Sequence, residues 1–337
     1  MLIEAFKGLD RLVTIDLRDF NARRSRDQGS WNSWGSQSVY QETGRQPDVH
    51  VLLSDQIKFT GQLFSTLIYA LGLAGRKLPR LEVPLSDYKG FLPDESFRLS
   101  DALFPTIEHV LLNLEVLYLA VAMTSSGSVA SRRLRHFLNC TPNLKHLRLN
   151  FNREIQHGNV EFLEWLAALS DRAHISPQPY RATLAGPSSA RLPQLMVLEL
   201  GRLDIQATML LAVIKKFGPR LERLSLRRIC LIRDSIVDRY SSDGSWEQFL
   251  ADLALVNLPS LKYFSLDHPS IMDVVRGSIH RKPVDGRGIP MTWNYADQDS
   301  SDFFLDLGET LTYRRPKPKT IAPPVSSDDS DVDDESD

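Results

Sequence analysis

One pattern of residues recurs along this chain and limits what it can fold into. A proline is followed by apolar residues at the second, fifth and seventh positions after it. Because the last two apolar positions are two residues apart, their side chains lie on the same side of a short strand. The five matches begin at Pro105, Pro142, Pro193, Pro219 and Pro259. The pattern therefore predicts one strand-containing unit that is used several times.

The spacing of the matches supports a repeat. Pro193 and Pro219 are 26 residues apart, which falls within the period of about 20 to 29 residues of a leucine-rich repeat. We interpret the longer intervals as one unit plus an insertion. Two less regular segments, LPRLEVPLS and RLVTIDLRD, occur earlier: the first has Pro84 where an apolar residue belongs, and the second has no proline. Together these segments predict six or seven repeats.

Segments with helical spacing precede the strand patterns. Residues 206–217 predict a helix that Gly218 ends and that Pro219 prevents from continuing. Ser245 and Gln248 form a capping box for a helix that begins at residue 246. The other helical segments are 160–170, which Asn159 can cap, and 131–139. The order helix, turn, strand is thus repeated.

A single unit of this kind cannot be stable alone. Burying its three strand leucines contributes roughly 6 kcal/mol, whereas ordering a unit of this length costs on the order of 39 kcal/mol. We therefore predict an α/β fold, an irregular leucine-rich-repeat solenoid with a curved parallel sheet and helices on the outer face. The solenoid is expected to span 1–280, with a polar insertion near 21–47, an irregular extension at 281–323 and a disordered acidic tail at 324–337.

Three blocks of the sequence resemble a known family. They are TPNLKHLRL at 141–149, the block at 192–231 that begins LPQLMVLELGRL, and WEQFLADLALVNLPSLKYFSLDH at 246–268. These blocks look like the leucine-rich-repeat region of fungal F-box proteins. The resemblance implies that the repeats hold a target protein, while an N-terminal F-box docks onto a cullin-RING ubiquitin ligase.

No F-box is seen in this sequence, because repeat-like sequence begins by Leu12 and the segment Leu92-Pro93-Asp94-Glu95 is a chance match among the repeats. We expect a non-catalytic recognition protein that binds a protein target on its concave face and acts as the target-binding component of an SCF-type ubiquitin ligase. The ligase adaptor is an expected partner if the full-length product carries an F-box. One alternative is a scaffold or regulatory binding protein with no ligase link, and a remote one is a hydrolase.

The motifs of common catalytic and cofactor sites are absent from the sequence. The eight histidines form no HExxH spacing, and neither a GxSxG elbow nor a GxxxxGK or GxGxxG loop occurs. Cys140 and Cys230 show no CxxC spacing, so neither a disulfide framework nor a zinc site is indicated. We expect no enzyme activity, no cofactor and no metal.

The residues between the strand leucines face the opposite way and would line the concave face, the usual ligand surface of such solenoids. The outlying members of this surface are Thr14, Asp16, Arg18, His109, Leu111, Asn113, Val197, Gly201 and Ser265. The candidate partner-binding residues are His146, Arg148, Asn150, Glu199, Arg223, Ser225, Arg227, Tyr263 and Asp267. His146 and the three arginines, with Tyr263, would form a basic strip suited to an acidic protein segment. Alternatively, these charges only keep an exposed strand face soluble.

Charge is unevenly distributed along the chain. The last twelve residues hold seven acids and no base, so residues 1–325 carry all 40 Lys and Arg against 35 of the 42 acids, a net charge of +5. This is well short of the concentrated positive surface of a nucleic-acid-binding protein. We expect the tail to be disordered, with Ser326 and Ser330 resembling acidophilic kinase sites. RRPKPK at 314–319 resembles a short nuclear import signal.

The longest apolar stretch, at 110–123, includes Asn113 and Glu115 and is about fourteen residues long, whereas a membrane-spanning helix needs roughly twenty. The first residues carry acids among their apolar ones, unlike a secretory signal. We therefore expect a soluble, intracellular protein, cytoplasmic and/or nuclear, that binds neither nucleic acid nor a membrane.

Overall fold

The computed structural model describes residues 1–18, 53–85, 91–123, 131–152, 158–169, 189–232, 246–275, 278–283, 291–294 and 304. Several predicted features lie outside these residues: the insertion at 21–47, the basic motif at 314–319, and the acidic tail at 324–337 with Ser326 and Ser330.

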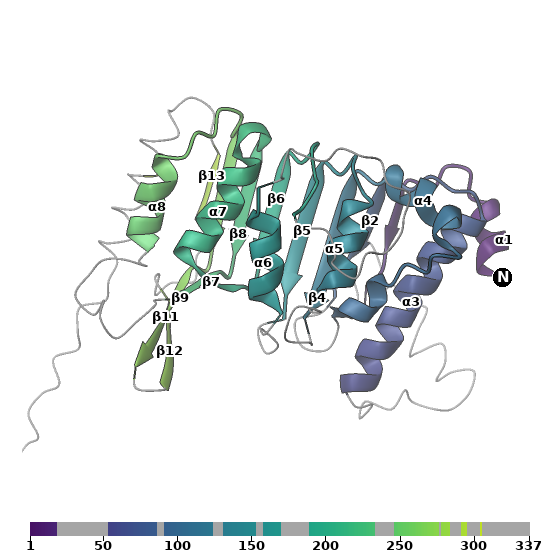
Figure 1. The fold of residues 1–337 in the computed structure, drawn as a ribbon, viewed down its shortest axis with the longest axis horizontal. Helices are drawn as coiled ribbons and strands as arrows, with labels where there is room; N and C mark the ends of the chain where they lie inside the picture. The colour runs from purple at the N-terminus through teal and green to yellow at the C-terminus, as the bar shows by residue number, and fades with distance from the viewer. Residues whose placement is uncertain are drawn as a thin grey trace, which may run out of the picture.

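A parallel β-sheet of seven strands runs through the molecule (Figure 1). The strands are β1 (Thr14–Asp16), β2 (Arg80–Val83), β4 (Val116–Ala122), β5 (His146–Phe151), β6 (Val197–Gly201), β8 (Arg223–Arg227) and β10 (Tyr263–Asp267). Each strand lies beside the next one in the chain, so the spatial order never reverses. The short β3 (Leu92–Pro93) also pairs with β4, and β13 (Met291–Asn294) adds an antiparallel strand beside β10.

The helices flank this sheet. They are α1 (Leu2–Lys7), α3 (Leu53–Leu73), α4 (Phe104–Leu112), α5 (Arg132–Asn139), α6 (Asn159–Ala167), α7 (Ala207–Phe217) and α8 (Trp246–Ala254), with short 3-10 helices η1 (Asp94–Phe97) and η2 (Gly218–Arg220). Helices α5 to α8 cover one face of the sheet (Figure 1). The strand order explains this, because right-handed crossovers between strands that never reverse direction across the sheet place every helix on the same side. The α/β prediction is thus confirmed as a parallel sheet with flanking helices.

A second, smaller sheet continues from the last three parallel strands. It contains β7 (Asp204–Gln206), β9 (Cys230–Ile232), β11 (Ser270–Val275) and β12 (Ser278–Pro283). The chain passes from β6 to β7, from β8 to β9 and from β10 to β11 through one residue with a positive φ: Arg202 (61°), Arg228 (53°) and His268 (51°). The same turn therefore follows three of the parallel strands, although none of these residues is glycine.

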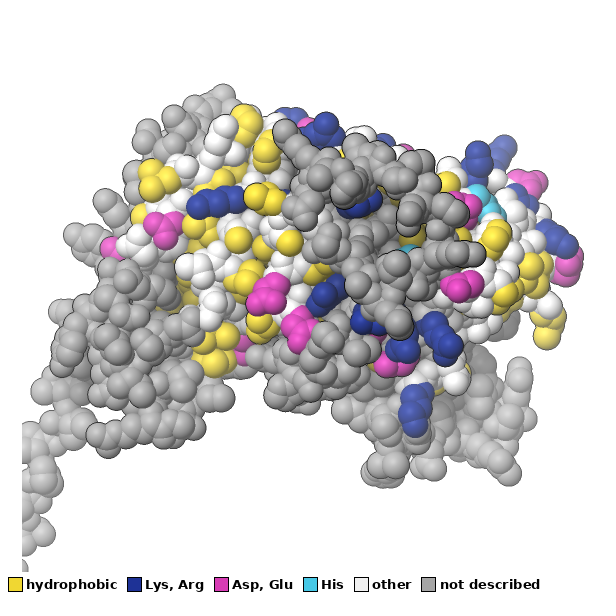
Figure 2. Space-filling model, viewed as in Figure 1, with side chains coloured by type: hydrophobic (Ala, Val, Ile, Leu, Met, Phe, Trp, Pro, Cys, Tyr) yellow, Lys and Arg dark blue, Asp and Glu magenta, His cyan; other side chains and the backbone are white. Residues whose placement is uncertain are grey.

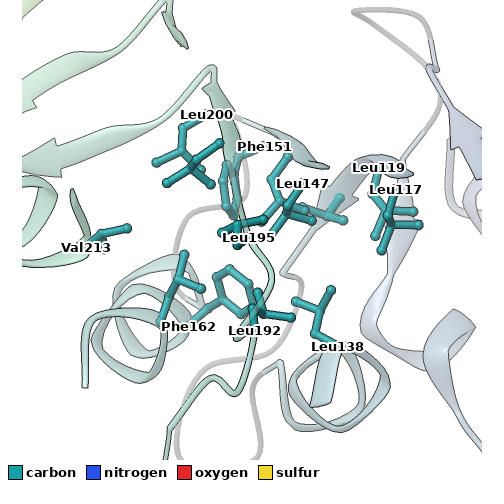
Figure 3. Close-up of a cluster of buried hydrophobic side chains, with 14 of the residues drawn as sticks. Leu117, Leu119, Leu138, Leu147, Phe151, Phe162, Leu192, Leu195, Leu200 and Val213 are labelled. Carbon is teal, nitrogen blue, oxygen red and sulfur yellow. The ribbon is translucent and has the colours of Figure 1, made fainter. Parts of the chain in front are cut away.

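The core lies between the sheet and its helices. The alternate strand residues Leu147, Leu149 and Phe151 are fully buried on β5. In Figure 3, Leu147 and Phe151 lie beside Leu195 and the α6 residue Phe162. Figure 2 shows the helix-covered side from outside, where hydrophobic side chains lie among scattered basic and acidic ones.

The strands enter the sheet with one repeated hydrogen-bond pattern. The backbone N–H groups of Lys145 and His146 both donate to the carbonyl of Glu115, and those of Met196 and Val197 both donate to that of Lys145. The same paired donation recurs at the starts of β4, β8 and β10. A tight turn precedes each of these five strands. In each turn the backbone N–H of one leucine donates to the carbonyl three residues before it; these leucines are Leu114, Leu144, Leu195, Leu221 and Leu261.

One of the five proline matches is wrong. The segment that begins at Pro105 was expected to be a strand, but it forms α4, and the strand β4 begins only at Val116. The buried residues Ile107, Val110 and Leu111 have helical rather than alternating spacing, and a proline in the first turn favours helix initiation. His109, Leu111 and Asn113 therefore do not belong to a strand face.

Two local predictions also need correction. LPRLEVPLS does form β2, but Leu81 lies in register with Leu117, so Leu78 and not Leu81 occupies the first leucine position, and Pro84 follows the strand. Asn159 does not cap α6: it lies inside the helix, 2% exposed, and neither side-chain amide atom has a hydrogen-bond partner among the described residues. The other predicted helices match α5, α7 and α8.

Candidate protein-binding face

The sheet face opposite α5 to α8 carries three rows of side chains, which we call the open face. Strand register places them side by side. The first row is Thr14, Arg80, Val116, His146, Val197, Arg223 and Tyr263. The middle row is Asp16, Glu82, Tyr118, Arg148, Glu199, Ser225 and Ser265. The third row is Ala120, Asn150, Gly201, Arg227 and Asp267.

All nine candidate partner-binding residues therefore come together on the open face. They lie on β5, β6, β8 and β10, and adjacent strands of a sheet are about 4.8 Å apart. His146 and Arg223 flank Val197 in the first row, and Arg148 lies beside Glu199 in the middle row. The alternation of buried leucines with outward polar residues is what positions them, as the sequence pattern predicted.

A hydrogen-bonded network occupies the middle of the open face. His146 Nε2 lies 2.8 Å from Glu199 Oε1, and His146 Nδ1 lies 3.2 Å from the Tyr118 hydroxyl. In the neutral imidazole this arrangement lets Nε2–H donate to the carboxylate while Nδ1 accepts from the phenol. Arg148 Nε lies 3.7 Å from Glu199 Oε2. The network ties three neighbouring strands together.

The charge of Glu199 is stabilised by this network. Burial alone raises the pKa of Glu199, but the hydrogen bond from His146 and the charges of Arg148 and Arg223 together lower the pKa below its ordinary value. The carboxylate is therefore ionised at neutral pH. Burial, together with the charge of Glu199, raises the pKa of Tyr118, so this tyrosine keeps its proton.

Three guanidinium groups on the open face lie over aromatic rings. Arg80 and Arg148 both lie over the ring of Tyr118, with their Cζ atoms 5.4 Å and 5.6 Å from its centroid. Arg223 lies over Tyr263 at 4.6 Å. These distances are within the range of cation–π attraction. Stacking of this kind holds the long arginine side chains in place and lowers the entropy cost of binding a ligand.

The open face is not the uniformly basic strip that the sequence suggested. Its four arginines are balanced by four carboxylates: Asp16, Glu82, Glu199 and Asp267. Arg80 pairs with Glu82, Arg148 with Glu199, and Arg227 with Asp267 at 3.0 Å. Among the described residues, Arg223 alone of the four has no carboxylate partner. The guanidinium without a carboxylate partner therefore lies at the β8 end of the face.

The sequence reasoning missed Arg80, Glu82 and Tyr118. The template required a proline, and the strand β4 is preceded by Leu112 at the position where β5, β6, β8 and β10 are preceded by proline. The signal that could have found it is Leu114-x-x-Leu117-x-Leu119, which repeats the leucine spacing of TPNLKHLRL. Once Leu81 is placed in register with Leu117, Arg80 and Glu82 are identified as open-face residues of β2.

The Cys140 thiol and the possible metal-ligating side chains are the other candidates for chemistry in the described residues. Burial raises the pKa of the half-buried Cys140 thiol to about 12, which makes it unreactive as a nucleophile. Within the described residues, no three His, Cys, Asp or Glu side chains are grouped so that they could hold a metal ion. None of the helices in the described part of the chain is both long and apolar enough to cross a membrane.

Comparison with known proteins gives no relative for this chain: no family model, no curated protein and no solved structure matches it.

Proposed function

We propose that this chain is a non-catalytic recognition protein that binds another protein through the open face. The observation that carries the proposal is the strand order, which places the helices on one side and leaves three rows of mostly polar and aromatic side chains on the other. In doubly wound α/β folds, ligands bind where the strand order reverses. This sheet has no such reversal, so the face itself offers the extended surface.

We also propose that the fold is an irregular leucine-rich-repeat solenoid of seven units, one for each parallel strand. The repeated turn and the paired backbone donation at β4, β5, β6, β8 and β10 support this interpretation, as does the shared left-handed residue after β6, β8 and β10. Solenoids of this kind use their strand face to bind proteins. The composition of the open face fits that use, because tyrosine and arginine are the residues most enriched at binding hot spots.

The resemblance to fungal F-box proteins suggests that the bound protein is delivered to a cullin-RING ubiquitin ligase. A scaffold or regulatory binding protein without a ligase link uses the same face, and the two functions differ only in what else co-purifies. The decisive difference is whether a cullin and its adaptor accompany the target.

The test is quantitative affinity purification from the native cell with a tagged chain and two matched tryptophan variants. Ser225→Trp places a bulky ring in the middle of the open face, and Val160→Trp does the same on α6, where Val160 is 54% exposed. We expect Ser225→Trp to deplete a defined set of partners that Val160→Trp retains, with both variants folded by circular dichroism. Retention of every partner by Ser225→Trp would remove the open face from the function.

If a cullin and its adaptor co-purify with both the wild type and Ser225→Trp, the ligase role is supported. Their absence, with target binding intact, supports the scaffold.

A further inference from the structure

Two exposed arginines, Arg223 and Arg227, lie at the β8 end of the open face. Arg223 is exposed, and its guanidinium carbon lies 4.6 Å from the centroid of the Tyr263 ring, within the range of a cation–π contact. A guanidinium that stacks on a ring keeps its N–H edges available, and those edges match a carboxylate in bidentate geometry. Arg227 is half-exposed and uses its Nε for Asp267, which leaves its terminal N–H groups. Two arginines on one strand therefore offer donors to the same ligand.

The spacing of these donors fits an extended ligand. Arg223 and Arg227 are four residues apart on β8, which corresponds to about 13 Å along a strand. The hydroxyl-bearing residues Ser225 and Ser265 lie between them in register. An extended chain that carries several acidic side chains can place carboxylates at both arginines.

The sequence itself contains such a chain. Residues 326–337 carry seven acids and no base within twelve residues. They lie outside the described residues, but a residue earlier in the chain, Phe304, packs against β10, the strand next to β8. Phe304 is fully buried, with its ring centroid 5.1 Å from that of Phe264 on β10, and Phe264 is in register with Leu224 on β8.

The connection is long enough to reach the open face. Phe304 and Ser326 are 22 positions apart, and a fully extended chain of that length spans at most about 73 Å. The path from the core side of β10 around β13 to the open face of β8 is on the order of 25 Å, from a sheet spacing of about 10 Å and strand spacings of about 4.8 Å. Tethering over such a distance gives a millimolar effective concentration.

We propose that the acidic segment 326–337 of this chain binds its own open face at Arg223 and Arg227. The contact is electrostatic and weak per charge, so salt weakens it, and it depends on tethering rather than on a deep pocket. A protein target of the same face must displace the segment. The proposal stands independently of the proposed function, because the contact exists whether or not a partner binds there.

The test is the nuclear magnetic resonance spectrum of the acidic segment in the ¹⁵N-labelled full chain. Three proteins are compared with an isolated peptide of residues 324–337: the wild type, the double variant Arg223→Gln/Arg227→Gln, and the control Lys77→Gln/Lys215→Gln. The control removes the same charge from two exposed lysines outside the open face. We expect the segment's resonances to differ from those of the free peptide in the wild type and in the control. In the β8 variant they should move most of the way to the free-peptide positions.

Three outcomes would overturn the proposal. Identical segment resonances in all three proteins would show that β8 is not the site, and this is also the result expected if the carboxylates pair locally with the basic residues 314–319. Equal movement in the control would show a non-specific charge effect. Differences that vanish on dilution of the wild type would assign the contact to a second copy of the chain rather than to its own segment.

Discussion

At the scale of single residues, the buried polar groups of Lys216 and Asp94 have measurable effects on the free energy of unfolding. Lys216 on α7 has its amine buried and, within the described residues, without a hydrogen-bond partner. Burial lowers the pKa of Lys216 from 10.5 to about 8. At pH 7 the amine is charged in both the folded and the unfolded chain, so the folded state bears the full cost of burying the charge.

The consequence is a stability that rises with pH. Between about pH 8 and 10.5 the folded protein holds a neutral amine while the unfolded chain still binds a proton, so the free energy of unfolding increases across this window. We expect Lys216→Met to raise the melting temperature at pH 7, and the advantage to shrink as the pH approaches 10.5. Lys215→Met, at the exposed neighbour on the same helix, should show no such pH-dependent gain. A pH-independent gain for Lys216→Met would contradict the burial argument.

Asp94 has the opposite role, because it satisfies donors that would otherwise be unpaired. Its carboxylate accepts the backbone N–H groups of Leu134 at 3.0 Å and of Arg133 at 3.3 Å, at the start of α5. Burial raises the pKa of Asp94, and the two N–H groups partly oppose this. We expect Asp94→Ala to lower the free energy of unfolding by about 1–2 kcal/mol, as for other lost helix caps. By urea denaturation, Glu95→Ala should lower the free energy of unfolding by less than about 0.5 kcal/mol, because the ion pair of Glu95 with Arg133 is exposed. Equal losses for both variants would show that Asp94 does not cap the helix.

At the scale of elements, one glycine sets the distance between two helices. A Cβ on Gly72 of α3 would lie 2.6 Å from the Thr106 carbonyl oxygen and 2.9 Å from Ile107 Cγ2 on α4. Because the nearest atom belongs to the backbone, the helices must separate. We expect Gly72→Ala to lower the free energy of unfolding by about 1–2 kcal/mol. Overpacking costs about 1–3 kcal/mol, which exceeds the gain of up to about 1 kcal/mol from the higher helix propensity of alanine. Gly8→Ala, whose nearest contact is 3.5 Å, should change the free energy of unfolding by less than about 0.5 kcal/mol.

The elements also show what the sequence could predict. The leucine spacing placed β5, β6, β8 and β10 and their outward residues correctly, because alternation along a strand is a local property of the chain. It failed at Pro105, where the proline that opens a strand unit elsewhere instead begins α4. The ion pairs of the open face were beyond prediction, because the partners Arg148 and Glu199 are 51 residues apart and meet only through strand register.

At the scale of the whole molecule, each inner strand of the parallel sheet is packed between two neighbouring strands. Leu147 of β5 is fully buried between β4 and β6, so a charge there cannot reach water. We expect Leu147→Asp to destabilise the fold by several kcal/mol and to lower the cooperativity of unfolding. The matched control is Val160→Asp on the exposed surface of α6, which should leave the melting curve essentially unchanged. An unaltered melting curve for Leu147→Asp would contradict the packing described for β5.

In the proposed function, the two sides of the sheet have separate roles in stability and in binding. One side of the sheet buries leucines against helices, and the other side presents arginines, tyrosines and carboxylates held by one another. Substitutions on the open face should therefore change binding more than folding, whereas those on the helix side should do the reverse.

The most direct test of this account is the dissociation constant of the strongest partner from the affinity purification, measured with purified proteins. Tyr263→Ala removes an aromatic ring from the open face, and Leu255→Ala removes an 87% exposed side chain just after α8. The account predicts that Tyr263→Ala weakens binding at least roughly tenfold, as expected for a hot-spot aromatic residue, while Leu255→Ala binds like the wild type. Wild-type affinity for Tyr263→Ala, or a larger loss for Leu255→Ala, would contradict recognition through the open face.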